Sequence, residues 1–154
     1  MRVFAFTSAR ALFALVIAAA AAGCSGGITG SDSAQVAAAS PQIQITDTKV
    51  GTGISPKPGQ ICVVHYTGWL YANGVKGAKF DSSVDRKHTF SFTLGNHGVI
   101  EGWEQGLATM QKGGKRTLII PPELGYGSKG SGASIPPNAT LMFDIELLDV
   151  KAAS

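Results

Sequence analysis

The stretch LGNHGVIEGWEQGL, residues 94–107, decides the fold that this sequence predicts. In it and just beyond it, Ile100, Trp103, Leu107 and Met110 recur at steps of three and four residues. That spacing is typical of one buried face of an α-helix, and glycines on both sides mark where the helix begins and ends. A tryptophan on such a face is most often part of a core. Trp103 also lies near the helix start, where a pocket can open.

Strand patterns surround this helix on both sides. Apolar runs or apolar alternation occupy residues 43–46, 61–66, 89–94, 115–120 and 140–150. Glycine and proline separate these segments, so we expect loops at residues 71–78 and 121–137. Every second residue of the last segment is apolar, which is typical of a strand with one face in water. The sequence therefore predicts an α+β domain at residues 41–151, with a twisted antiparallel sheet closed over one short helix.

The first 40 residues have a different composition. Arg2 and Arg10 accompany an apolar run at residues 11–22, which is too short to span a bilayer and suits the core of a signal peptide. The run ends in small residues before Cys24 and is similar to a bacterial lipoprotein signal, although Ala21 stands where leucine is more usual. An ordinary secretory signal with a chance cysteine is the alternative.

We therefore expect a signal peptide at residues 1–23, lipid on Cys24, and a flexible Gly/Ser/Ala-rich tether at residues 24–40. Ser25 after the cysteine favours the outer membrane, on its periplasmic or its surface side.

Charge and cysteine content exclude several classes of protein. The formal charge is +3, but two of the 13 basic residues lie in the leader, leaving 11 against ten acidic residues. Since no basic stripe remains, we expect no nucleic-acid partner. Cys62 is then alone in an apolar run, which predicts a small buried hydrophobic residue.

The motifs of common enzyme classes are absent. Residues 125–130 fit GxGxxG, but they follow two prolines and lead to two more instead of opening a helix, so we reject a dinucleotide site. His65, His88 and His97 lack the spacing of metal ligands, so we expect no metal and no cofactor. No nucleophile or carboxylate pair stands out.

Five short strings nevertheless occur together in one order. They are VHYTG (64–68), KFDSS (79–83), GVIEGW (98–103), GYG (125–127) and IPPNATL (135–141). In this order the chain closely resembles the FKBP family of peptidyl-prolyl cis–trans isomerases over residues 41–150. The resemblance implies a five- to six-stranded antiparallel half-barrel wrapped around the central helix.

The resemblance also implies a proline pocket. Trp103 corresponds to its floor, Tyr126 to a hydroxyl donor at its rim, Asp81 to the carboxylate inside it, and the Ile100 backbone N–H to a second donor. Arg86 corresponds to the residue that holds Asp81 in place. Ile135 corresponds to the loop residue that closes one side. The implied apolar walls are Tyr66, Phe80, Phe90, Val99, Ile100 and Phe143.

The chain departs from the family pattern at the rim. Ser131 stands where many relatives have histidine, and Ala133 and Ser134 precede Ile135 where Gly-Ile is common. The segment between Trp69 and Lys79 is a few residues longer than in the smallest relatives. These differences bear on substrate preference more than on activity.

By this resemblance the protein accelerates rotation of X–Pro bonds in exported, unfolded proteins. The implied ligands are proline-containing peptides and FK506- or rapamycin-like macrolides. A non-catalytic peptide-binding module or chaperone that uses the same groove is the alternative. Because the tether contains no long helical pattern, we expect a monomer held to the membrane by its lipid.

Overall fold

The elements that the sequence predicts are present in order along the chain. The structure, a computed structural model, describes residues 40–152. The strands are β1 (Gln44–Lys49), β2 (Ile61–Ala72), β3 (Val75–Ser82), β4 (Phe90–Thr93), β5 (Lys115–Ile120) and β6 (Thr140–Lys151). Helix α1 (Glu101–Ala108) and two 3₁₀ turns, η1 (Pro122–Leu124) and η2 (Gly127–Lys129), complete this part of the chain. The predicted α+β class is confirmed.

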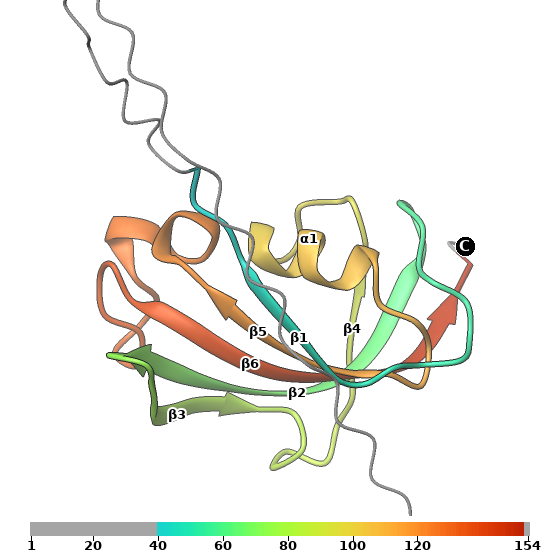
Figure 1. Cartoon of the computed structure of the whole chain (residues 1–154), viewed down its shortest axis with the longest axis horizontal. Coiled ribbons are helices and arrows are strands. Elements are labelled where there is room, and N and C mark those ends of the chain that lie inside the picture. The colour runs from blue at the N-terminus through green and yellow to red at the C-terminus, as the bar shows by residue number, and fades with distance from the viewer. Residues whose placement is uncertain (1–39, 153–154) are drawn as a thin grey trace, which may run out of the picture. The chain divides into compact units, whose positions relative to one another are not determined.

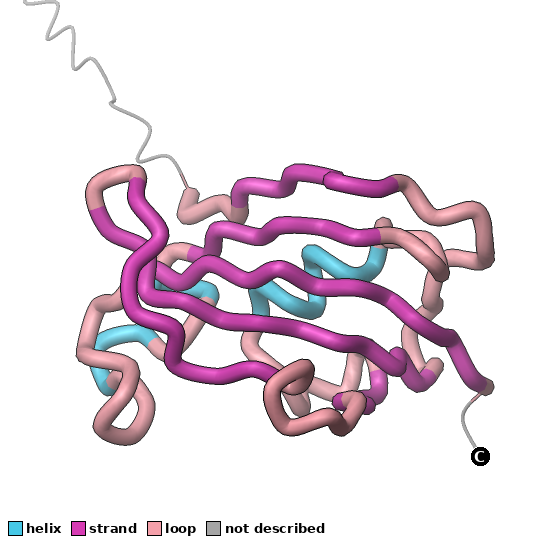
Figure 2. The backbone as a smooth tube through the Cα atoms, turned by 90° about the horizontal axis from the view of Figure 1, so that it is seen from below, coloured by secondary structure: helices cyan, strands magenta, loops and turns pink. Residues whose placement is uncertain are grey.

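All of the strand pairs are antiparallel, and the sheet order is β1-β5-β6-β2-β3, with β4 paired to β2. The long strands β2 and β6 lie side by side at the centre, and their residues alternate between buried and half-buried. Figure 1 shows the curved sheet with α1 on one face, and Figure 2 shows the strands from the side away from the helix. The side chains that alternate inward from both central strands therefore face the helix.

Two glycines allow α1 to lie close against the sheet. A Cβ atom at Gly102 would come within 2.5 Å of Ile120, and one at Gly106 within 2.5 Å of Leu118. Each glycine costs the helix about 1 kcal/mol relative to alanine, whereas full burial of one leucine contributes about 1.5–3 kcal/mol. Burial of Trp103 and Leu107 together thus outweighs the poor helix propensity of the two glycines.

Helix α1 is shorter than the apolar stripe suggested. Ile100 is its N-cap and Thr109 its C-cap, so Met110 lies beyond the helix. Met110 is still buried, and its backbone N–H donates to the Leu107 carbonyl at 3.0 Å. A residue just past the C-cap of a helix can thus continue its apolar face.

The expected loop at residues 71–78 is wrong. Strand β2 runs to Ala72 and β3 begins at Val75, so only Asn73 and Gly74 form the turn. Both have positive φ, 53° and 78°, as a two-residue type I′ hairpin turn requires. Pairing across the hairpin, with Tyr71 opposite Lys76, outweighs the glycine-rich composition that suggested a loop.

The long segment at residues 121–137 holds η1, η2 and a bridge between Ser131 and Ile135, and is otherwise irregular as expected. Within residues 40–152, no helix is long and apolar enough to cross a membrane. The predicted signal peptide, Cys24 and nearly all of the tether lie outside the described residues.

Candidate functional site

A small cavity of about 150 Å³ opens between the start of α1 and the inner face of the sheet. Strands β2, β3, β4 and β6 all contribute side chains to it, and Tyr126 closes it from the segment before η2. Its lining residues are Tyr66, Phe80, Asp81, Phe90, Gly98, Val99, Ile100, Trp103, Tyr126 and Phe143. All of the predicted pocket residues except Arg86 and Ile135 therefore lie together around this cavity.

Trp103 forms the base of this cavity. Its side chain is 4% exposed, and the ring centroids of Tyr66, Phe143 and Phe90 lie 5.0, 5.3 and 5.9 Å from its own. The interplanar angles are 81–87°, so the neighbouring rings meet the indole edge to face, the arrangement that aromatic quadrupoles favour. Packing from several strands thus holds the indole in one orientation.

Gly68 on β2 makes room for two of the walls. A Cβ atom there would lie 2.6 Å from the Phe80 ring and 2.8 Å from the Phe143 ring. Because the glycine has no side chain, these rings approach each other over β2, with centroids 5.6 Å apart at 85°.

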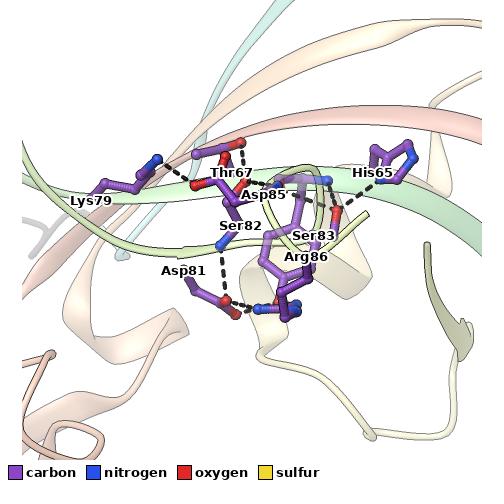
Figure 3. Close-up of polar contacts among 9 residues, drawn as sticks. His65, Thr67, Lys79, Asp81, Ser82, Ser83, Asp85 and Arg86 are labelled. Carbon is purple, nitrogen blue, oxygen red and sulfur yellow. Dashed lines mark hydrogen bonds and ion pairs between the residues drawn. The ribbon is translucent and has the colours of Figure 1, made fainter. Parts of the chain in front are cut away.

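The carboxylate in the cavity is held by its neighbours. Figure 3 shows Asp81, near the end of β3, pointing toward Arg86 in the segment that follows. The Tyr66 hydroxyl and the Arg86 guanidinium donate to its two oxygens, and the Ser82 backbone N–H donates at 2.8 Å. Arg86 also donates to the Tyr66 hydroxyl oxygen at 3.1 Å, so the three side chains form a closed ring of hydrogen bonds.

These contacts decide which of the groups are charged. Burial alone would raise the pKa of the Asp81 carboxyl, but the hydrogen bonds from Tyr66 and Arg86 outweigh it and hold the pKa below its usual value. Burial, and then the hydrogen bond to Asp81, raise the pKa of Tyr66. At neutral pH the cavity therefore contains a carboxylate and a neutral phenol.

Tyr126 is exposed over 39% of its surface, and it lies at the mouth of the cavity. Burial, and then the negative charge of Asp81, raise the pKa of its hydroxyl, so it stays protonated. A protonated phenol at a rim can donate one hydrogen bond to a carbonyl that enters the cavity.

Two predicted residues lie elsewhere. Arg86 does not line the cavity and acts on it through Asp81 and Tyr66. Ile135 is 6% exposed and belongs to the apolar core, where its backbone bridges to Ser131. The rim residues Ser131, Ala133 and Ser134 do not line the cavity either.

Two supporting residues were missed by sequence reasoning. Ser83 is fully buried, and its hydroxyl accepts the Tyr66 backbone N–H at 2.8 Å and contacts His65 Nδ1 at 3.0 Å (Figure 3). Glu104 is 9% exposed and contacts the segment before α1. The sequence does indicate that Glu104 is buried, because it lies four residues after Ile100 and three before Leu107, on the apolar face of the helix.

A larger hollow of about 620 Å³ lies around Tyr71, Ile119 and Pro136. Asparagine, glutamine, threonine, proline and aliphatic residues make up the rest of its lining, with no ionisable group except the Tyr71 phenol. The smaller cavity, in contrast, combines a rigid aromatic base with a carboxylate and a phenol donor, and it is the stronger candidate site.

Comparison with known proteins agrees with this geometry. Residues 52–148 match the family model described as FKBP-type peptidyl-prolyl cis-trans isomerase. A Neisseria meningitidis serogroup A protein named FK506-binding protein is 50% identical over 106 residues, which are 69% of this chain and 94% of that protein. FK506-binding protein 2 of Candida glabrata is 56% identical over 93 residues, 60% of this chain and 66% of that protein.

A similar solved structure is the crystal structure of FkpA from Escherichia coli. It superposes with a TM-score of 0.66 at 46% sequence identity and covers 73% of this chain. The chain spans 49% of the length of FkpA, about half of that protein.

Proposed function

Because the chain belongs to the family of FKBP-type peptidyl-prolyl cis-trans isomerases, and is itself such an isomerase, we propose that the cavity over Trp103 is where it rotates X–Pro bonds. The observation that carries this assignment is the ring of aromatic side chains that meets the buried indole edge to face. A cavity of about 150 Å³ suits a group the size of a proline ring.

The reaction needs no covalent step. Rotation about an X–Pro bond is slow because the amide C–N bond has partial double-bond character, with a barrier of roughly 18–20 kcal/mol. In the twisted amide the nitrogen becomes pyramidal and the carbonyl loses charge separation, so this state is less polar than either planar form. An apolar cavity that excludes water therefore favours the twisted state, and each ~1.4 kcal/mol of preference gives about tenfold in rate.

Polar groups at the edge orient the substrate. The Ile100 N–H lies at the start of α1, where backbone N–H groups have no partner within the helix, and it donates to a substrate carbonyl. The Tyr126 hydroxyl donates to a second carbonyl. Asp81 stays charged and acts electrostatically on the rotating carbonyl dipole, with Tyr66 and Arg86 holding it in place.

Turnover of an apolar-X–Pro peptide in a protease-coupled assay tests this assignment. We expect Trp103→Leu and Asp81→Ala to lower kcat/KM by about tenfold or more, since each removes a group that faces the substrate. Trp69→Leu and Asp85→Ala are matched controls: Trp69 stacks under Lys76 Nζ at 3.7 Å and Asp85 pairs with Lys79, both away from the cavity lining. Wild-type turnover in both pocket variants would show that the cavity is not the site.

FK506-like macrolides are the second class of ligand. The names of the Neisseria and Candida relatives record FK506 binding, and such ligands bind this family. We expect a macrolide to occupy the same cavity and to inhibit turnover competitively. If Trp103→Leu kept its affinity for the macrolide, the macrolide would bind at a site other than the cavity.

The protein also acts at a membrane in this proposal. The leader and Cys24 support export and lipidation, which would hold the isomerase near proteins that fold after export, on the outer membrane. Mass spectrometry of the mature N-terminus tests this: an unmodified Cys24, or a chain that retains residues 1–23, would contradict it. Sedimentation of the lipid-free domain is expected to show a monomer, and a stable dimer would overturn that part.

A further inference from the structure

A buried acid lies next to the cavity and faces away from it. Glu104 is the fourth residue of α1, and both of its carboxylate oxygens accept backbone N–H groups from the segment before the helix. Oε2 accepts the Gly95 N–H at 2.6 Å, and Oε1 accepts the His97 N–H at 3.1 Å. One side chain therefore clamps two points of the loop at residues 95–98.

The backbone of this loop is shaped around the carboxylate. Gly95 and His97 both have positive φ, 80° and 50°. Alternation of left-handed with ordinary residues turns successive N–H groups toward one point, a concavity that binds anions. A residue other than glycine adopts this conformation only where its surroundings compensate for the strain, and here the Glu104 carboxylate supplies the compensation for His97.

The clamped loop leads directly into the cavity. Gly98, Val99 and Ile100, the three residues after His97, line it. The Ile100 carbonyl accepts the Trp103 N–H at 2.9 Å and the Glu104 N–H at 3.3 Å. Glu104 thus holds this segment at both ends, with its carboxylate on the loop and its backbone N–H on Ile100.

We propose that Glu104 is a positioning residue for X–Pro isomerisation, which fixes the Ile100 N–H and the Val99 side chain against the substrate by holding the loop at residues 95–98. This inference rests on the proposed function of the cavity. Glu104 does not line the cavity, so its effect is exerted through the loop.

The chemistry of the clamp predicts how each variant of Glu104 weakens it. Glutamine has nearly the same shape as glutamate, but its amide presents one acceptor and one donor group. One loop N–H would therefore face an NH₂ group and lose its acceptor. Aspartate keeps both acceptors, but its side chain is one methylene shorter and draws them back from N–H groups that lie 2.6 and 3.1 Å from the glutamate, so Glu104→Asp is expected to lose activity as well.

The experiment measures kcat and KM for an X–Pro peptide together with amide hydrogen exchange at Gly95 and His97. Glu104→Gln is expected to lower kcat/KM by about 10- to 100-fold, since a small misplacement of a positioned group has effects of that size. Exchange at both amides is expected to speed up as well. Glu123→Gln, at an exposed glutamate of η1 outside the cavity lining, is the control for the same chemical change and should stay within about twofold of wild type.

A second control separates positioning from loss of stability. Asp47→Asn weakens the buried Arg116 contact away from the loop, and at a temperature where it and Glu104→Gln are both folded it should keep wild-type kcat/KM. Equal losses in these two variants, or wild-type kcat/KM in Glu104→Gln, would overturn the inference. A loss of turnover in Trp103→Leu would in that case still uphold the cavity as the site. Wild-type turnover in both Trp103→Leu and Asp81→Ala would instead overturn the proposed function itself.

Discussion

Gly68 shows how strongly the site depends on the absence of one Cβ atom. Phe80 on β3 and Phe143 on β6 both pass over it, closer than a methyl group would allow. The two rings are walls of the cavity. The shape of its apolar surface therefore depends on the absence of a side chain at Gly68, which does not line the cavity itself.

Gly68→Ala is expected to push the two rings apart, at a cost of about 1–3 kcal/mol in the free energy of unfolding, as overpacked cores show. Because the walls move, peptide turnover and macrolide affinity should both fall by at least about tenfold. Denaturant unfolding and the coupled assay measure the two effects. Wild-type turnover in a folded Gly68→Ala protein would contradict this account of the walls.

At the scale of elements, a buried arginine joins β1, β5 and α1. Arg116 on β5 is 6% exposed; its Nε and Nη2 donate to Asp47 on β1 at 2.6 and 2.9 Å. Its Nη1 donates to the Gly106 carbonyl at 2.5 Å and to the Thr109 hydroxyl at 2.7 Å, at the end of α1. The last turn of the helix contains no basic residue of its own, so a cation from the sheet meets its unpaired carbonyls.

Removing the two partners is expected to have unequal effects. Asp47→Ala leaves a buried guanidinium without its counter-charge and should lower the free energy of unfolding by about 3–5 kcal/mol. Arg116→Met leaves one charged partner, Asp47, whose side chain is 38% exposed and can be hydrated, and two neutral ones, the Gly106 carbonyl and the Thr109 hydroxyl, so its cost should be smaller. Chemical denaturation of both single variants and the double variant measures the coupling, and a larger loss in Arg116→Met would contradict this reasoning.

At the scale of the whole molecule, the ionisable groups around the fold and the site define a pH range. The pKa values of Asp47 and Asp81 lie below their usual values in the folded protein, whereas those of Tyr66 and Tyr126 lie above theirs. Across the neutral range, the carboxylates are therefore charged and the phenols are neutral.

Stability should accordingly be level between about pH 5 and pH 8. Below this range the unfolded carboxyls take up protons first, so the free energy of unfolding falls as pH drops through about 4 and through the folded pKa values. Above it the unfolded Cys62 thiol loses its proton first, because burial raises its pKa to about 11 in the folded protein, and the unfolded phenols follow at about pH 10. Stability therefore falls as pH rises through this range. Asp81→Asn should reduce the acid-side loss.

Peptide turnover should be flat over the same range, because no group in the cavity changes its charge there. A pH series of kcat/KM checks this expectation. A step between pH 6 and 7 would contradict it and would indicate a titrating group in the reaction.

Much of the fold could be read from local patterns. Period-two alternation predicted β6 and its inward Leu141 and Phe143, and period-three-and-four spacing predicted α1 with Trp103 inside, because both signals repeat within a few residues. The hairpin at Asn73 and Gly74 was missed, since strand pairing there is decided by partners across the turn and not by composition.

The sequence by itself determined which residues are apolar, how they repeat, and which strings resemble a known pocket. Only the tertiary structure decided that Glu104 clamps the loop at residues 95–98, that Arg116 donates to carbonyl oxygen at the end of α1, and that Ile135 belongs to the core. The physical reason is that a buried charge is stable only beside particular partners. For Arg116 that partner is Asp47, 69 residues away, and no local pattern records which distant segments pack together.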